Sequence, residues 1–247
     1  MKLEGNTIVI TGGGSGIGAG LAVRLATAGN RIVIAGRRAD RLAEVASRAP
    51  GIETRVCDVS DENQRGDLVS WLAKAHPETN VFVNNAGVQM SGNFLSGIDP
   101  AKMRMEIETN IVALFHLSDL ASRLVAGKSG ATIVNVSSGL AFAPLAFLPV
   151  YCATKAAVHS FTMSLRHQLK TKGIDVVEII PPAVDTELGR DRRTGSSEVS
   201  HGGLSVDEFV DAVLEGFASG LHEIPVGSAT DLRTSGEKAF EGMNSRR

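Results

Sequence analysis

The sequence of 247 residues has little cysteine, few aromatic side chains and no marked excess of charge of either sign. Its two cysteines, Cys57 and Cys152, form no CxxC pair, which argues against a disulfide scaffold and favours a reducing compartment. The formal net charge of −2 provides no basic footprint for nucleic acid. We therefore expect no nucleic-acid partner.

Targeting and metal-binding patterns are also lacking. The uncharged stretch 137–154 contains Pro144 and Pro149 and does not resemble a membrane span. The first residues lead directly into a predicted strand and lack the shape of a signal peptide. The six histidines show no metal-ligand spacing, so we expect no metal. These absences predict a cytoplasmic protein with no membrane partner.

Short β-branched runs alternate with longer helical segments along the chain. Near-continuous apolar strands, each followed by a helix, are typical of a parallel sheet covered on both faces. The predicted strands are 7–10, 31–35, 53–57, 81–83, 132–136, 176–180 and 223–226. Right-handed crossovers then predict a doubly wound α/β fold with a parallel seven-stranded sheet. No linker divides the chain, so we predict a single domain over 1–247.

A glycine-rich turn over residues 11–18 separates the first strand from the first helix. Glycine lets the backbone turn tightly and approach a phosphate closely, and the helix N-terminus adds N–H groups and a positive dipole end. Its place after the first strand favours dinucleotide binding over a purely structural turn. Two registers fit the spacing, Gly14-x-Gly16-x-x-Ala19 and Gly12-x-x-x-Gly16-x-Gly18.

The end of the second strand bears on which nicotinamide cofactor would bind. An acidic residue there would hold the ribose 2′-hydroxyl of NAD. This sequence has Gly36-Arg37-Arg38 instead, and a guanidinium matches a phosphate. We therefore predict NADP(H). The alternative is that the arginines begin a solvated helix face, although arginine opposes the dipole at a helix start.

Tyr151 and Lys155 are four residues apart on a predicted helix and so share one face. A nearby ammonium lowers the pKa of a phenol, which an acid/base group for carbonyl chemistry needs. The spacing alone is common and carries little weight. Ser137 and Ser138, however, end the fifth strand, and ligands bind at the carboxyl ends of parallel strands. These groups, the glycine turn and residues 84–87 should therefore border one cleft.

Taken in order, these features resemble the short-chain dehydrogenase/reductase family, in a poorly characterised bacterial oxidoreductase branch of similar length. The resemblance rests on the glycine turn, Asp58, Asn84-Asn85-Ala86-Gly87, Asn110, and Ser138 with Tyr151-x-x-x-Lys155. It implies a Rossmann fold and a homodimer or homotetramer. It also implies that Gly12, Gly16 and Gly18 are the family's three glycines.

The resemblance implies a role for each matched residue. Tyr151 would be the general acid/base, and Lys155 would lower its pKa and hold the nicotinamide ribose. Ser138 would bind the substrate oxygen, and Asn110 would hold a helix kink and a water on a proton relay. The residues expected to bind the cofactor are Gly12, Gly14, Ser15, Gly16, Ile17, Gly18, Arg37, Arg38, Asp58, Val59, Asn85, Ala86, Gly87, Tyr151, Lys155, Pro181, Val184 and Thr186.

We thus predict an NADP(H)-dependent oxidoreductase that moves a hydride between nicotinamide and a carbonyl or secondary alcohol, acting on the CH–OH group of donors. The alternatives are a non-catalytic NADP-binding sensor or scaffold, and an epimerase or dehydratase that recycles its cofactor. The apolar loop 140–148 suggests either an apolar substrate wall or a subunit contact. We expect 186–204 to be a mobile substrate lid. The apolar helix 150–170 suggests a subunit interface, together with the helix 100–126.

Overall fold

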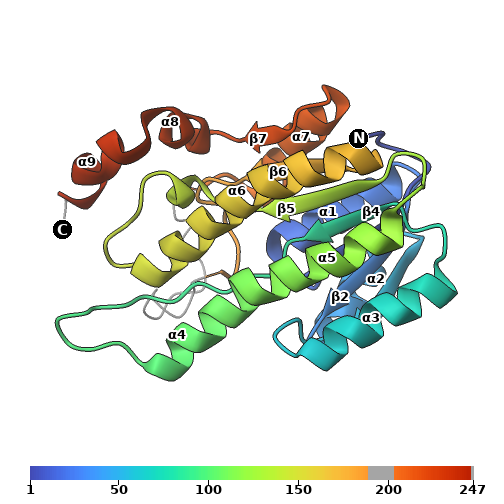
Figure 1. Ribbon diagram of the computed structural model, residues 1–247, viewed down its shortest axis with the longest axis horizontal. Helices are drawn as coiled ribbons and strands as arrows, with labels where there is room; N and C mark the ends of the chain where they lie inside the picture. Colours follow the sequence, from blue (N-terminus) through green and yellow to red (C-terminus); the bar gives the residue numbers. More distant parts are fainter. Residues whose placement is uncertain (189–202, 246–247) are drawn as a thin grey trace.

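A computed structural model describes residues 1–188 and 203–245. Seven parallel strands form one sheet in the order β3-β2-β1-β4-β5-β6-β7 (Figure 1). Their bounds are β1 (Thr7–Thr11), β2 (Arg31–Gly36), β3 (Ile52–Val56), β4 (Val81–Asn84), β5 (Thr132–Val136), β6 (Asp175–Ile180) and β7 (Glu223–Pro225). The predicted doubly wound parallel sheet is confirmed, and the strand order reverses between β1 and β4, where ligands of such sheets bind.

Helices connect the strands and pack on both faces of the sheet. They are α1 (Gly16–Thr27), α2 (Ala39–Ala46), α3 (Glu62–Ala75), α4 (Pro100–Ile107), α5 (Ala113–Val125), α6 (Pro149–Leu169), α7 (Val206–Ala218), α8 (Ser228–Ser235) and α9 (Phe240–Asn244). Short turns of other helix types are η1 (Glu108–Val112), η2 (Gly139–Ala141), η3 (Lys170–Lys172) and η5 (Gly236–Ala239). Across the described residues, none of the helices combines the length and the apolar composition that crossing a bilayer requires.

Alternate residues of each central strand belong to two separate cores. Ile8 and Ile10 pack in a core with side chains of α1, α2 and α7, whereas Val9 packs in a core with side chains of α3, α5 and α6. This alternation follows from the two-residue period of a strand. Because both faces are covered, the central strands are apolar nearly throughout, which is the pattern that predicted a parallel sheet.

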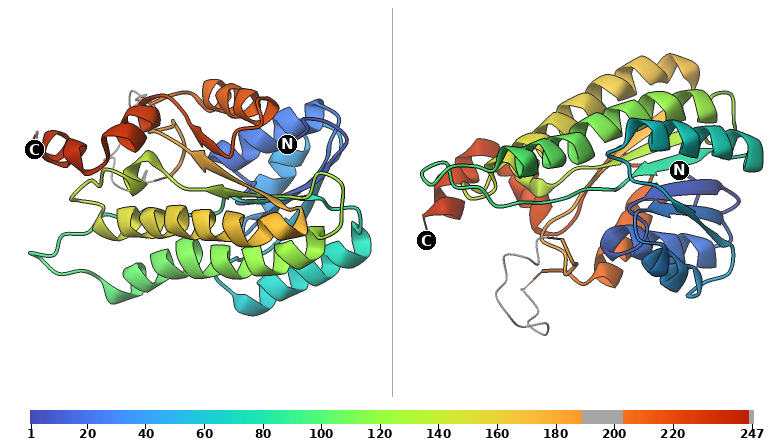
Figure 2. Two further views of the ribbon diagram at one scale, coloured as in Figure 1. Left: turned by 45° about the horizontal axis from the view of Figure 1, so that its top comes forward. Right: turned by 90° about the horizontal axis from the view of Figure 1, so that it is seen from below.

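The segment predicted as one helix over 100–126 is interrupted in its middle. Helix α4 leads into the π-helical turn η1, and α5 continues from it. Figure 2 shows α4 and α5 following one another alongside α6. A π turn carries one extra residue per turn and is often associated with a functional site. Asn110, for which the resemblance implied a role at a helix kink, lies within this turn.

The segment after Gly227 forms α8, η5 and α9. Its far end contacts the apolar loop before α6. Asn244 donates from Nδ2 to the carbonyl oxygen of Pro144 at 3.1 Å and accepts from the Ala146 N–H at 2.7 Å. The C-terminal segment therefore fixes the backbone of the loop that leads to Tyr151.

Most of the predicted lid, residues 189–202, lies outside the described residues. Its two ends are joined to each other. Val184 and Leu204 form a parallel bridge, and the Asp185 N–H donates to the Leu204 carbonyl oxygen at 2.9 Å. The base of this segment is thus held by backbone hydrogen bonds, and its mobility stays a prediction.

Candidate active site

The predicted site residues gather at the carboxyl edge of the sheet. The glycine turn follows β1, residues 85–87 follow β4, and Ser137 and Ser138 follow β5. Strands β1, β4 and β5 are direct neighbours in the sheet. Helix α6, which carries Tyr151 and Lys155, starts a short distance along the chain from Ser138. The sheet order therefore brings together segments that are far apart in the sequence.

The glycine turn is packed tightly against the segment after β4. Gly12 has a φ of +68°, and a Cβ on it would lie 2.8 Å from the Cα of Ala86. A Cβ on Gly18 would lie 2.5 Å from the Gly12 oxygen and from Nδ2 of Asn85. Glycine is thus required at both positions, by conformation at one and by space at the other. These contacts favour the register that contains Gly12, Gly16 and Gly18.

The start of α1 suits an anion. Its N-cap residue, Ser15, makes no side-chain capping bond, and the first turn holds no acidic residue. The first N–H groups and the positive end of the helix dipole are therefore left for a negatively charged ligand. Thr186 lies across from this turn, with its Cβ 3.2 Å from where a Cβ of Gly16 would be. The chain's own residues thus fit a dinucleotide pyrophosphate at this position.

The arginines after β2 lie beside the glycine turn. Arg38 is the N-cap of α2, and its Nη2 atom lies 3.4 Å from Ser15 Oγ. The same Nη2 is 3.1 Å from a carboxylate oxygen of Glu187, and Arg41 contacts that carboxylate at 3.4 Å. Arg37 is exposed. Sequence reasoning did not find Glu187 and Arg41, because the ion pairs connect residues that only the fold brings together.

Asp58 and Val59, which the family resemblance would place beside the adenine of the cofactor, follow β3. The Asp58 carboxylate accepts from the N–H and the hydroxyl of Ser60, at 3.0 and 2.8 Å. Val59 is buried, and its carbonyl oxygen accepts from the Arg65 guanidinium at 2.6 Å. The loop is therefore held in shape by its own contacts. Whether it binds adenine stays a prediction.

Asn110 links three elements. Its Oδ1 accepts from the Val88 N–H at 2.9 Å, and its Nδ2 donates to the Val88 carbonyl oxygen at 2.8 Å. The same amide donates to Oγ1 of Thr154 on α6 at 3.1 Å, and Thr154 donates to the Tyr151 carbonyl oxygen at 2.7 Å. The loop after β4, the π turn and the first turns of α6 are thus held together. This arrangement fits a positioning role for Asn110.

Tyr151, Lys155 and Ser138 are all buried. The Lys155 ammonium donates to the Val136 carbonyl oxygen at 2.8 Å and lies 5.7 Å from the centre of the Tyr151 ring. Burial lowers the pKa of Lys155 to about 8, although Glu178 and Glu106 act to raise it. Ser138 Oγ accepts from the Leu140 N–H at 3.1 Å, so its hydroxyl hydrogen can be donated elsewhere. Lys155 thus lies close to Tyr151 and to the end of the strand that Ser138 follows. The catalytic roles of these residues stay a prediction.

Pro181, Val184 and Thr186 follow β6 on the same edge of the sheet. The Pro181 carbonyl oxygen accepts from the Gly139 N–H at 2.9 Å, which ties the segment after β6 to the one after β5. Gly87 lies near Lys155, since a Cβ there would be 3.7 Å from the ammonium. The segments that follow β4, β5 and β6 therefore lie next to one another at this edge of the sheet. Whether they enclose a nicotinamide stays a prediction.

A row of four polar residues, three of them buried, crosses the sheet, and sequence reasoning missed it. Asn84, Asn135, Glu178 and Glu223 are register partners on β4, β5, β6 and β7. Asn84 donates to Asn135 at 2.9 Å, and Asn135 donates to Thr162 on α6 at 3.0 Å. A polar residue within one apolar strand gives little signal by itself. Only strand register places these four side by side.

The burial of Lys155 predicts a pH-dependent cost to stability. Between the folded pKa of about 8 and the ordinary value of 10.5, the unfolded chain holds a proton that the folded chain has lost. Wild-type stability should therefore rise with pH across this window, by about 3 kcal/mol in total. Lys155→Met removes this dependence. Compared with wild type at the same pH, the variant should therefore have a higher free energy of unfolding at pH 7 than at pH 10. Urea unfolding of both proteins at several pH values measures it.

The exposed Lys172, substituted to methionine, is the matched control and should not alter the pH dependence. A constant difference in the free energy of unfolding between wild type and Lys155→Met, from pH 7 to pH 10, would contradict the assigned burial cost.

Known proteins are similar to this chain in sequence and in fold. The model of the short chain dehydrogenase family matches residues 6–197. The uncharacterized oxidoreductase DltE of Bacillus subtilis (strain 168) is 44% identical over 249 aligned positions, which cover 99% of this chain and 98% of DltE. This relative supports the oxidoreductase assignment and names no substrate.

Solved structures show the same fold. A short chain dehydrogenase from Burkholderia cenocepacia J2315, in complex with NADP, superposes with a TM-score of 0.83 at 27% identity, covering 95% of this chain and 94% of that one. A short chain dehydrogenase/reductase from Burkholderia phymatum, in complex with NAD, gives a TM-score of 0.83 at 22% identity, covering 94% and 93%. The second likeness shows the fold alone. By the family match and the full-length relative, this chain belongs to the short-chain dehydrogenase family of oxidoreductases.

Proposed function

We propose that this protein is an NADP(H)-dependent oxidoreductase that interconverts a carbonyl and a secondary alcohol, with Tyr151 as the general acid/base. The observation that carries the proposal is the buried Lys155 ammonium, 5.7 Å from the centre of the Tyr151 ring and bonded to the end of β5. A cation held there favours the phenolate form of Tyr151. Family membership and the fit of the glycine turn to a pyrophosphate support a nicotinamide dinucleotide.

The chain's own residues would perform the proton chemistry. Nicotinamide, when bound, supplies or accepts the hydride. Tyr151 would give a proton to the substrate oxygen during reduction and take it back during oxidation. Ser138 would donate its hydroxyl hydrogen to the same oxygen and so orient it. Lys155 would hold the ribose and stabilise the phenolate, and Asn110 would keep α6 and the loop after β4 in place.

The apolar loop before α6 supports an apolar wall beside the reacting groups. Leu140, Leu145 and Phe147 pack against the cluster formed by Leu148, Tyr151 and Cys152. Pockets for small molecules are mostly apolar with a few placed polar groups. We therefore propose that the substrate presents an apolar portion next to its carbonyl.

Tyr151→Phe should lower NADPH oxidation against a panel of carbonyl compounds by about 10²–10⁴-fold, because the positioned acid/base is lost. Binding of NADPH, measured by calorimetry, should remain. Full turnover in this variant would refute the assignment. NADPH binding by wild type without consumption would favour the sensor alternative, and product formation without net consumption would favour an epimerase or dehydratase.

A substrate-free measurement supports the same test. Tyr151 is the only tyrosine in the chain, so the near-ultraviolet absorbance of tyrosinate reports this residue alone. Its midpoint in wild type should lie below the ordinary value of about 10. The absorbance change should vanish in Tyr151→Phe.

Preference for NADP(H) is the second part of the proposal, and it rests on Arg37 and Arg38. The Arg38 guanidinium lies near Ser15 at the start of α1, where a dinucleotide would pass. Glu187 pairs with both Arg38 and Arg41, so a 2′-phosphate would have to replace this carboxylate. Glu187 would thus be an internal competitor for the phosphate.

Arg38→Ala should weaken NADPH binding by roughly tenfold or more and leave NADH binding nearly unchanged, since one charged contact to the phosphate is lost. Glu187→Gln should strengthen NADPH binding. Glu44→Gln, which removes another partner of Arg41, is the control and should have a smaller effect. Calorimetric titration with both cofactors measures these changes, and tighter NADH binding by wild type would overturn the preference.

A homodimer or homotetramer remains part of the proposal. Helices α4 and α6 pack side by side (Figure 2), and their outer surfaces expose apolar side chains. Met105 on α4 is 40% exposed and Met163 on α6 is 50% exposed. Apolar side chains exposed on two packed helices suit burial against a second copy.

Met163→Glu should lower the sedimentation coefficient by shifting an oligomer toward monomer, because the carboxylate would be buried in the contact. Leu221→Glu, at a residue 48% exposed between α7 and β7, is the control and should leave the oligomer intact. An unchanged sedimentation profile for Met163→Glu would exclude this surface as the interface.

A further inference from the structure

Three charged side chains that lie around the proposed reaction centre are buried almost completely. Lys155, Glu106 and Glu178 are 5%, 1% and 0% exposed. Burying a charge is costly unless partners compensate it. Glu106, on α4, accepts from the Met90 N–H at 2.9 Å. Glu178, within β6, faces α6, and the proposed mechanism assigns it no role.

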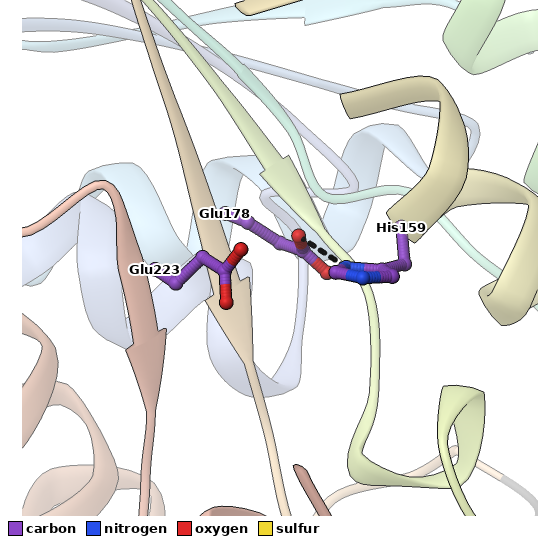
Figure 3. Close-up of side chains that lie close together, drawn as sticks. All are labelled: His159, Glu178 and Glu223. Carbon is purple, nitrogen blue, oxygen red and sulfur yellow. Dashed lines mark hydrogen bonds and ion pairs between the residues drawn. The ribbon is translucent and has the colours of Figure 1, made fainter. Parts of the chain in front are cut away.

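Glu178 is linked to Lys155 through residues that are neighbours along β5 and α6. Its carboxylate accepts from Ser137 Oγ at 2.5 Å. It also contacts Nδ1 of His159 at 2.9 Å (Figure 3). Val136, the residue before Ser137, accepts from the Lys155 ammonium at 2.8 Å. Lys155 and His159 are one helical turn apart on α6. Strands β5 and β6 and helix α6 therefore hold the ammonium and the carboxylate in a fixed relation.

We propose that Glu178 is a positioning residue for the reaction: its buried carboxylate, held by Ser137 and His159, supplies the fixed negative charge that keeps Lys155 cationic beside Tyr151. The proposal rests on the proposed roles of Tyr151 and Lys155. Glu178 acts through Lys155 and not on the substrate. The effect of Glu178 on the pKa of Lys155 is upward, against the larger downward effect of burial, and Glu106 acts in the same upward direction.

Other charges face this set from neighbouring elements. Glu223 on β7 is the register partner of Glu178, and Figure 3 shows it beside the pair. Its carboxylate lies 3.1 Å from the Arg233 guanidinium on α8 and 3.8 Å from that of Arg166 on α6. The positive charges of these arginines compensate the negative charge of Glu223. The partners of the Glu178 carboxylate are instead Ser137 and His159.

The same side chains place three potential metal-ligand atoms within 4.8 Å of one another, from His159, Glu178 and Glu223. A metal cation there would lie next to the two guanidinium groups that contact Glu223, and like charges repel. The hydrogen bonds of Glu178 already use its oxygens inside the protein. The Glu178 carboxylate is therefore better suited to compensating the charge of Lys155 than to binding a metal.

The proton on Lys155 is the quantity to measure. In a Tyr151→Phe background, which removes coupled titration of the phenol, side-chain NMR of isotope-labelled lysine gives the Lys155 midpoint. Glu178→Gln should lower that midpoint by about one pKa unit, because a nearby negative charge is lost. Glu223→Gln, the same change at the register partner that the arginines neutralise, should alter it far less. Glu178→Asp keeps the charge and should restore most of the wild-type midpoint.

An unchanged Lys155 midpoint in Glu178→Gln, or an equal fall in Glu223→Gln, overturns the proposal. If Glu178→Gln does not fold, Lys155→Met tests the coupling from the other side. Because coupling between two sites is reciprocal, the pKa of the Glu178 carboxyl, followed by NMR of labelled glutamate, should rise in that variant. An unchanged carboxyl titration overturns the proposal as well.

These titrations use neither substrate nor cofactor, so they fail separately from the proposed function. Loss of NADPH oxidation in Tyr151→Phe decides the role of Tyr151. The Lys155 midpoint decides the role of Glu178.

Discussion

The buried ammonium of Lys155 is the constraint on which the proposed chemistry depends. It is held where water is largely excluded, donates to the Val136 carbonyl oxygen and lies next to Tyr151. A charge in such a place is costly and persists only when the surrounding structure compensates it. The end of β5, the first turns of α6 and the acids on β6 and α4 supply that compensation. Positioning this one group thus requires four elements to keep their relative places.

The irregular backbone segments of the fold also help to keep Lys155 and Tyr151 in place. The π turn in the helical segment that includes α4 and α5 carries Asn110, whose amide joins Val88 to Thr154 and so joins the loop after β4 to α6. The tight approach of Gly12 and Gly18 to residues 85 and 86 fixes that loop from its other side. The C-terminal Asn244 holds the backbone of the loop before α6. Distant segments therefore set the geometry around Tyr151.

The arginines beside the glycine turn and the buried Lys155 both have carboxylate neighbours that belong to other elements. Near the glycine turn, Arg38 and Arg41 pair with Glu187 at the surface. Beneath the reacting groups, Glu178 is fully buried among Ser137, His159 and the α6 face that carries Lys155. The exposed pair is screened by solvent and can be replaced by an anionic ligand, whereas the buried charge is fixed by the sheet. The Glu187 carboxylate is thus suited to being displaced by an anionic ligand, whereas the Glu178 carboxylate is suited to staying in place.

The strands of the sheet and the most conspicuous chemical groups could be predicted from the sequence. The apolar period of the strands, the glycines after β1 and the four-residue spacing of Tyr151 and Lys155 are local patterns, and local patterns are set by nearby residues. Three other features could be found only in the folded structure: the π turn, the pairing of Arg38 with Glu187 and the row of polar residues that contains Glu178. These depend on strand register and helix packing, which bring together residues far apart in the chain. A single glutamate in an apolar strand gives no local sign of the histidine, serine and lysine that the fold places around it.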